Sequence, residues 1–535
     1  MVPEKPLPYS DEFTSPEEYT DALLSFATTS DLFQILCGGV HILDFFTTGD
    51  PGIFATIFDE DWREFLAACD IMDLLDLLMR DDLSGDLTKG QKLPVLPRKI
   101  ALGMKTKKVH EVTNFADYVD RLVEGICAEA STDDKDGGEE ITHLVDFGSG
   151  QNYLGRALAC PPYNRHVVAV EGREHNISGA KSLDLMAGIV KRPGVIRNKK
   201  LYQHMRAVAD LRPREEIGVE ASYEFEEGRG SIQYVVGTLE SGDLSHVVYK
   251  IRNVRPDQPE PTPENTEVAV VAADAQHEAE AGTGTGTETG TEVEARANND
   301  PDSQETQNQR LMAISIHSCG NLSNFGIRSL ILNPTIRAVA IPVNGRVARE
   351  SAKYDPEGFP MSDAFVHHAG GEGVRFNITA RMMACHDGEP VPAEELEQRG
   401  AGPESPFDMS TNPVILGSLR RGSYDSFKGY VRAAVLKLTT NTSYKQYAEV
   451  VERKMGNMTD EEIDGYEAVY GSRKKEIAVV WSLMAFSAAV VEAMIVTDRW
   501  LFLKEHSDLV KHCWVESVFD YKQSPRNLVI VGIKK

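Results

Sequence analysis

The chain has 535 residues, a formal net charge of −26 and a hydrophobic content of 41%. This length allows several domains with sizeable cores. Seven scattered cysteines without CxxC pairs indicate reduced thiols and argue against a structural zinc site. The start of the chain lacks the apolar core of a signal peptide, and the longest apolar run, Ile477–Val491, is short and interrupted by serines. We therefore expect a cytoplasmic or nuclear protein without a membrane span or a bound metal.

Residues 1–92 are expected to form a helical N-terminal region. The segment Ser15-Pro16-Glu17-Glu18 offers an N-cap, a proline at the first helical position and a capping-box acid. From Trp62 to Leu78, apolar residues recur at helical spacing. Glycine and proline in residues 82–97 then predict a linker into a second domain, residues 93–535.

A glycine loop opens the second domain. The apolar run that begins at Leu144 ends in Asp146 and is followed by Gly148-Ser149-Gly150 and then by helical spacing from Tyr153. This order of strand, tight loop and helix is typical of a nucleotide-binding α/β sheet. Glycines allow positive φ angles and a close approach of the backbone to a ligand, so we expect Asp146, Gly148, Ser149 and Gly150 to bind a cofactor.

The identity of the cofactor depends on two further positions. A second strand, residues 166–170, ends in Glu171, and an acid there suits the ribose hydroxyls of either NAD or S-adenosylmethionine. A dinucleotide fingerprint requires a third glycine where this chain has Tyr153. The missing glycine favours S-adenosylmethionine, and an NAD-dependent oxidoreductase stays as the alternative.

Two segments between the strands have unusual charge. Six cations and no acid occur from Lys191 to Arg206, which makes this basic patch a candidate contact for nucleic acid. Residues 256–308 contain thirteen acids and one cation, with few large apolar side chains. Such a segment cannot offset its own ordering entropy, and we expect a disordered acidic insertion within the second domain.

Seven strands interleaved with helices predict a doubly wound α/β sheet of the class I methyltransferase type, which is Rossmann-like. The last two strands are separated only by residues 520–527, so we expect them to form an antiparallel hairpin. The predicted strands are His143–Asp146, Val167–Val170, Ile232–Val236, Leu311–Ile316, Ile336–Val343, Cys513–Phe519 and Leu528–Ile533.

Four segments resemble the eukaryotic methyltransferase-like protein 25 family, whose members are also described as ribosomal RNA adenine dimethylase domain-containing proteins. They are Lys107-Lys108-Val109-His110-Glu111, the glycine loop, His317-Ser318-Cys319-Gly320-Asn321-Leu322-Ser323, and Phe519-Asp520-Tyr521-Lys522-Gln523-Ser524-Pro525-Arg526-Asn527. The resemblance implies a class I methyltransferase that uses S-adenosylmethionine, and its acceptor, whether RNA, protein or a small molecule, stays open. The first of these segments is interpreted either as a lid in which Lys108 or His110 meets the carboxylate of the cofactor, or as a solvated helix start.

The chain departs from this family after the fifth strand. Where the family usually has Cys-Cys-Tyr, this chain has Asn344-Gly345-Arg346. The acceptor is expected between this segment, the loop His317–Asn321 and the turn Pro525–Asn527. In that arrangement His317 acts as the base, since imidazole titrates near neutrality, and Asn321 and Asn527 orient the acceptor. A catalytically inactive cofactor-binding or scaffold protein remains open as an alternative.

Overall fold

The computed structural model describes most of the sheet and its helices. The described residues are 2–38, 60–68, 95–133, 141–189, 230–239, 241–251, 309–316, 318, 321–343, 358–371, 373–374, 376, 416, 419–521, 523–524 and 527–535. The basic patch, the acidic insertion, most of the 82–97 linker and the Asn344–Arg346 segment therefore lie outside the described residues, and the expectations for them remain predictions.

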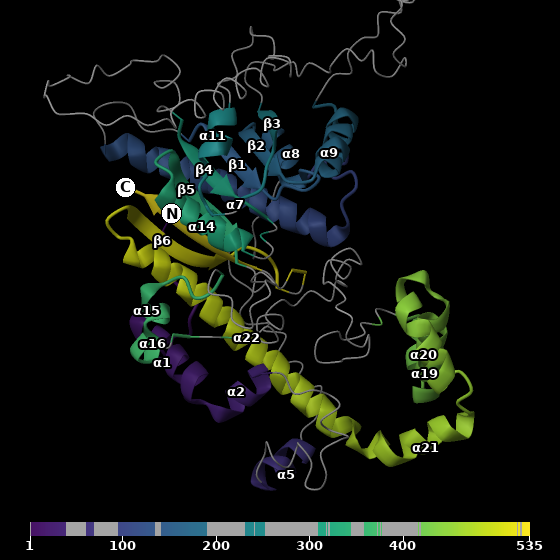
Figure 1. Cartoon of the computed structure of the whole chain (residues 1–535). Coiled ribbons are helices and arrows are strands. Elements are labelled where there is room, and N and C mark those ends of the chain that lie inside the picture. The colour runs from purple at the N-terminus through teal and green to yellow at the C-terminus, as the bar shows by residue number, and fades with distance from the viewer. Residues whose placement is uncertain are drawn as a thin grey trace, which may run out of the picture.

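A seven-stranded sheet forms the centre of the molecule, in the order β3-β2-β1-β4-β5-β7-β6 (Figure 1). The neighbours from β3 to β5 are parallel, whereas β7 pairs antiparallel with both β5 and β6. The sequence-based fold class and the terminal hairpin are confirmed. The strands are β1 (His143–Phe147), β2 (His166–Glu171), β3 (Ser231–Val236), β4 (Leu311–Ile314), β5 (Ile336–Pro342), β6 (Val510–Ser517) and β7 (Leu528–Lys534).

Two strands, β4 and β6, have ends that differ by two or three residues from the predicted ones. Strand β4 ends at Ile314, two residues before the predicted Ile316, because the chain leaves the sheet at Ser315. Strand β6 begins at Val510 rather than Cys513 and continues the pairing with β7 beyond a bulge. Near the N-terminus, the carbonyl of Pro6 accepts a hydrogen bond from Val515 N at 2.8 Å, which covers part of this edge strand.

Helices cover both faces of the sheet. On one face, α7 (Thr106–Asp133) and α8 (Tyr153–Ala159) enclose an apolar cluster built on inward residues of β1, β4 and β7. On the other face, α14 (Leu322–Leu332) and α22 (Lys474–Glu505) enclose a second cluster. The remaining described helices are α9 (Glu174–Ala187), α11 (Ser245–Lys250), α15 (Asp363–Val366), α16 (His368–Gly371), α19 (Phe427–Thr440), α20 (Lys445–Met455) and α21 (Asp460–Tyr470), with short 3-10 turns at Arg421–Tyr424, Thr442–Tyr444 and Gly471–Arg473.

Two of the described N-terminal helices pack on the same core as the sheet. The N-terminal helices are α1 (Pro16–Thr29), α2 (Asp31–Gly38) and α5 (Glu60–Ala68), and buried side chains of α1 and α2 join the cluster that α22 covers. Ser15 caps α1 as predicted, because its side chain accepts from Glu18 N at 3.1 Å. The Glu18 carboxylate, however, binds the backbone N and hydroxyl of Thr14 instead of Ser15. The expected capping box is thus displaced by one residue.

The apolar run Ile477–Val491 lies within α22, and seven of its residues are buried, among them Val479, Met484 and Val491. The continuous helical stretch Asp460–Glu505 is nevertheless long and apolar enough to span a bilayer, by length and composition alone. Its most apolar window is 61% buried inside the molecule. A helix that packs along a sheet passes the same test, so length and composition do not identify a membrane span here.

Candidate cofactor site

The glycine loop turns at the carboxyl end of β1. Gly148 and Gly150 have φ angles of 67° and 57°, and Asn152 at the N-cap of α8 has a φ of 53°. All three are in the left-handed region, which glycine occupies without steric cost. A Cβ atom placed on Gly150 would meet no atom within 4 Å. The loop therefore presents open space at Gly150, where a ligand can approach the backbone.

Glu171, at the carboxyl end of β2, closes one side of this loop. Its side chain is buried, and Oε2 accepts a hydrogen bond from Gly150 N at 2.8 Å. Its Oε1 accepts from Arg173 N at 3.0 Å and from Asn176 Nδ2 at 3.2 Å. The glycine loop and the acid that sequence reasoning paired are thus in direct contact. A carboxylate offers about four lone-pair positions, so capacity for ribose hydroxyls remains on Oε2.

Asp146 is the most unusual group in the site. Its carboxylate is 1% exposed, and neither oxygen has a hydrogen-bond partner in the described part of the chain. Burial raises the pKa of Asp146 to about 7, with Glu171 raising it further and the Lys108 ammonium opposing the shift. Because an unpaired buried acid is costly, this position is suited to the donor groups of a bound ligand.

Lys108 reaches the same region from the first turn of α7. Its Nζ lies 3.6 Å from Glu111 Oε2, and its side chain is 18% exposed. Burial lowers the pKa of Lys108, whereas the charges of Glu111 and Asp146 raise it. The structure thus brings Lys108 together with the predicted acids of the glycine loop. Its contact with a cofactor remains a prediction.

His110 and Glu111 face the β6–β7 turn. His110 Nε2 accepts from Asp520 N at 3.1 Å, and its Nδ1 lies 3.2 Å from Asn114 Nδ2. Glu111 Oε1 accepts from Ser524 Oγ at 2.8 Å. Burial lowers the pKa of His110, which favours the neutral ring. Two motifs far apart in sequence therefore hold one another, and both nitrogens of His110 lie against protein atoms.

The predicted acceptor residues are only partly described. Asn321 is 9% exposed and stands at the N-cap of α14, where its side chain makes no capping bond. Asn527 Nδ2 donates to Ser517 Oγ at 2.7 Å, and its carbonyl accepts from Val518 N at 2.8 Å, so Asn527 braces the hairpin. His317 and Arg526 lie outside the described residues, as does the Asn344–Arg346 segment.

A buried polar network behind the loop was not foreseen from the sequence. Arg156 Nε donates to Asp184 Oδ1 at 3.0 Å, and both side chains are fully buried. Arg156 also donates to the carbonyl of Gln151 at 3.0 Å. Tyr234 links Asp184 to Asn152, whose Nδ2 donates to the tyrosine oxygen at 3.1 Å. The sequence signal that could have indicated this network is a charged residue among apolar neighbours in each of the helices α8 and α9.

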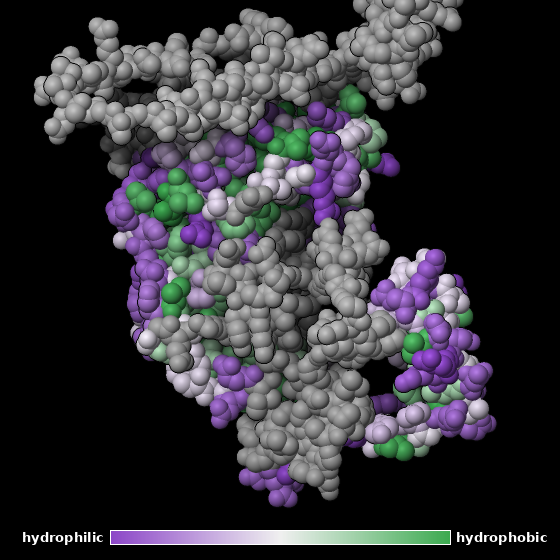
Figure 2. Space-filling view, viewed as in Figure 1, coloured by the Kyte–Doolittle hydropathy of each residue, from purple (hydrophilic) through white to green (hydrophobic). Residues whose placement is uncertain are grey.

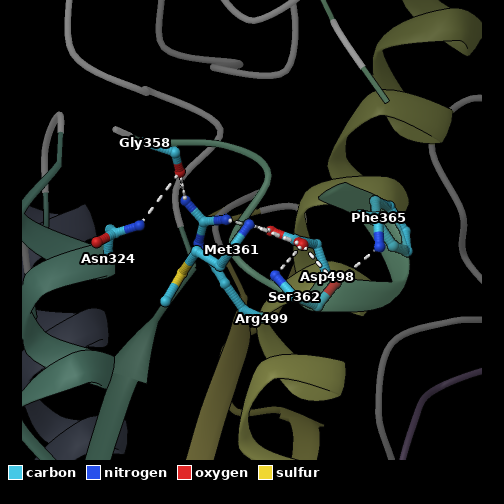
Figure 3. Close-up of polar contacts among 7 residues, drawn as sticks. All are labelled: Asn324, Gly358, Met361, Ser362, Phe365, Asp498 and Arg499. Carbon is cyan, nitrogen blue, oxygen red and sulfur yellow. Dashed lines mark hydrogen bonds and ion pairs between the residues drawn. The ribbon is translucent and has the colours of Figure 1, made fainter. Parts of the chain in front are cut away.

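A second unforeseen network lies on α22. The Asp498 carboxylate accepts from the backbone N of Met361 and of Ser362 at 2.9 Å, and from Ser362 Oγ at 2.8 Å. Asp498 and Arg499 are both buried, and Arg499 Nη1 lies 3.2 Å from Asp498 Oδ2. Figure 3 shows these groups converging on the 358–362 segment. Glu505 adds two further bonds, to the backbone N of Asp363 and Ala364.

Gly358 joins this network to the helix that follows β4. Its carbonyl accepts from Arg499 Nη2 at 2.9 Å and from Asn324 Nδ2 at 3.5 Å (Figure 3). Asn324 belongs to the first turn of α14, directly after the segment that contains Asn321. The segment 358–362, which follows β5 in the chain, and the start of α14, which follows β4, are therefore linked by hydrogen bonds beside the carboxyl edge of the sheet. No group of three or more potential metal ligands occurs among the described side chains.

Comparison with known proteins agrees with this arrangement. A family model described as a methyltransferase domain matches residues 107–342. The chain is 24% identical to probable methyltransferase-like protein 25 of Homo sapiens over 251 residues, which is 42% of this chain and 37% of that protein. It is 23% identical to the Mus musculus protein of the same name over 239 residues, with the same shares covered. The similarity thus spans well under half the length of these relatives.

Proposed function

The chain carries a methyltransferase domain of the methyltransferase-like protein 25 family, and on that premise we propose that it is a methyltransferase dependent on S-adenosylmethionine. The observation that carries the proposal is the buried carboxylate of Asp146, which accepts no hydrogen bond from the described residues, together with the open backbone of Gly150. A cofactor with an ammonium group and ribose hydroxyls supplies the donors that this acid and Glu171 can accept. When bound, it supplies the methyl group on its sulfonium.

Two features favour this cofactor over NAD. The dinucleotide-binding fold has an open, mostly parallel sheet in the order 3-2-1-4-5-6, whereas here β7 is inserted antiparallel between β5 and β6. The third fingerprint glycine is replaced by Tyr153, whose hydroxyl lies 2.9 Å from Gln151 Oε1 and 3.2 Å from the carbonyl of Gly103 and can donate to one of them at a time. The position that the fingerprint gives to a glycine for close packing of helix on strand therefore carries a large side chain here, directed to Gln151 and Gly103.

Calorimetry with S-adenosylhomocysteine and with NAD tests the cofactor. We expect binding of the former alone. Hydrogen bonds to a charged group are worth roughly 1.5–3 kcal/mol, so Glu171→Ala should weaken binding by about 10- to 150-fold. Glu174→Ala is the matched control, because it removes an exposed acid three residues further along. Unchanged affinity in a folded Glu171→Ala variant would refute the assignment.

We further propose that the acceptor, an RNA or a protein, is held between the loop His317–Asn321, the Asn344–Arg346 segment and the turn that ends at Asn527. His317 would accept the proton of the attacking group, with Asn321 and Asn527 as orienting groups. A base contributes roughly 10²- to 10⁴-fold to rate, so His317→Ala should lower methyl transfer by that factor and leave cofactor affinity unchanged. Radiolabelled S-adenosylmethionine with RNA and protein fractions as acceptors is the assay.

The altered segment after β5 decides between an active and a disabled enzyme. The test compares the wild-type chain with a variant in which Cys-Cys-Tyr is restored at positions 344–346. If the wild-type protein binds cofactor but transfers no methyl group, and the variant does transfer it, the chain is a disabled enzyme. Turnover by the wild-type chain would refute that alternative. Full turnover in His317→Ala would instead show that His317 only packs the loop.

A further inference from the structure

The helical arm, which we define as residues 421–470, is not used by the cofactor site. It consists of α19, α20 and α21, and it connects to the sheet through α22. Figure 1 places it to one side of the sheet, at the far end of α22. Its three helices pack on one another through α19. The arm therefore presents a separate surface, and its solvent side is open to a partner.

A groove of about 690 Å³ runs between the end of α20 and α21. Its lining includes Arg453, Lys454, Asn457, Tyr466, Val469 and Tyr470. The last three are 53%, 65% and 37% exposed, and their spacing places them on one face of α21. A Cβ atom on Gly465, beside Tyr466, would meet nothing within 4 Å. Two flat aromatic rings thus face solvent in an open trough.

The charges of the arm are distributed unevenly around this groove. Asp460 pairs with Arg432 at 2.7 Å, and Asp464 pairs with Lys428 at 2.8 Å. The groove acid Glu462 is used in the capping box, where it accepts from Thr459 N at 2.7 Å. Most acids of α21 are therefore engaged, and Glu467 pairs with Lys474 at 3.0 Å.

The cations of the groove are not compensated in this way. Arg453 and Lys454 are exposed, and neither takes part in an ion pair within the described residues. They stand together at the end of α20, beside the tyrosines of α21. In Figure 2 the arm shows hydrophilic and hydrophobic residues mixed over one surface. On a chain with a net charge of −26, two unpaired cations beside exposed rings form a local site for an anion with flat apolar parts.

We propose that this groove binds single-stranded RNA. Unpaired bases stack on exposed aromatic rings, while Arg and Lys follow the phosphates. The amide of Asn457 and the tyrosine hydroxyls have the donors and acceptors that recognise a 2′-hydroxyl. An amphipathic helical peptide instead requires an apolar trough with anchors over several turns, whereas here the apolar lining is limited to Met458 and one turn of α21, between polar groups. Binding to this groove is independent of the proposed methyl transfer.

The test uses the full chain and a fluorescent 12-nucleotide RNA of mixed sequence, with anisotropy measured from 50 to 300 mM salt. Each phosphate contact contributes about 0.7 to the slope of log K against log salt for single strands. We expect Arg453→Gln and Lys454→Gln each to reduce the slope by that amount. Lys445→Gln, an exposed cation at the opposite end of α20, is the matched control and should leave the slope unchanged.

Stacking is tested at Tyr466. A stacked base is worth roughly 1–3 kcal/mol, so Tyr466→Ala should weaken RNA binding by about 5- to 150-fold, whereas Tyr466→Phe keeps the ring and the affinity. Circular dichroism confirms folding of each variant. Three results would overturn the proposal: no RNA binding at 50 mM salt, an equal loss in Lys445→Gln, or equal or tighter binding of the matching DNA or of an acidic 12-residue peptide. If calorimetry shows no binding of S-adenosylhomocysteine, the proposed cofactor fails, but the RNA-binding measurements still test this groove because they do not depend on the cofactor.

Discussion

Replacing Asp146 by Asn should stabilise the free protein and weaken its cofactor binding. Burial raises the pKa of this carboxyl to about 7, against about 3.9 in an unfolded chain. The folded state therefore binds the proton more tightly than the unfolded state. Wild-type stability is lost as the pH rises from about 4 through 7, because the buried carboxylate accepts no hydrogen bond within the described part of the chain and the Lys108 charge only partly offsets its burial.

The magnitude follows from the shift in the pKa of Asp146. Three pKa units at 1.36 kcal/mol each give roughly 4 kcal/mol, reached just above pH 7. Asn is nearly isosteric with a protonated Asp and stays neutral throughout. The free energy of unfolding of Asp146→Asn should therefore exceed that of wild type by an amount that increases with pH. Roughly 2 kcal/mol of this increase falls between pH 5.5 and 8.5.

Urea unfolding at pH 5.5, 7 and 8.5, followed by tryptophan fluorescence, measures this difference directly. Calorimetry at pH 8.5 should show weaker binding of S-adenosylhomocysteine to Asp146→Asn than to wild type, since the amide replaces a charged acceptor. Lys108→Met is the companion variant. Because the Lys108 charge holds the pKa of Asp146 down, Lys108→Met should raise this pKa. The loss of stability with rising pH should then continue to a higher pH than in the wild-type protein. A variant-minus-wild-type difference that is constant with pH would refute the reasoning.

Further substitutions test the parts that support the site. Asp498→Ala should lower the free energy of unfolding by about 3–5 kcal/mol in urea titrations, because it leaves a buried guanidinium unpaired. Arg156→Met should cost a similar amount, and the double variant with Asp184→Leu should recover most of it. Gly150→Val should abolish cofactor binding in calorimetry, since the residue has φ +57° and open space before it. A short Gly/Ser linker in place of residues 256–308 should change stability by only about 1 kcal/mol and leave affinity intact, and a large fall in stability would contradict it.

Local patterns were sufficient to predict the sheet. Each strand is a short apolar run bounded by turn residues, and the segment of eight residues before Leu528 leaves room only for a hairpin. The pairing of Gly150 with Glu171 was also predictable, because the spacing of one helix and one strand places both at the same edge of a parallel sheet. These features depend on periodicity and chain reversal, which a sequence records directly.

Long-range polar contacts could not be predicted in the same way. Nothing in the sequence near Asp498 indicates that its partners are backbone groups of Met361 and Ser362, more than 130 residues earlier. The hydrogen bond from Ser524 to Glu111 likewise joins segments separated by 413 positions. Such pairs depend on how helices pack across a finished sheet. A buried charge in an apolar helix signals only that some partner exists.

The contact between the α7 segment and the β6–β7 turn changes how the C-terminal motif can act. Sequence reasoning assigned Asn527 to the acceptor, yet its amide bonds to Ser517 within the hairpin. The same turn holds Glu111 through Ser524, and Glu111 in turn lies 3.6 Å from the Lys108 ammonium. The charge of Lys108 lowers the pKa of Asp146 and so makes ionisation of this buried acid easier. A chain of contacts therefore leads from the C-terminal turn to the cofactor acid, so this motif can influence the site by positioning α7 without touching an acceptor.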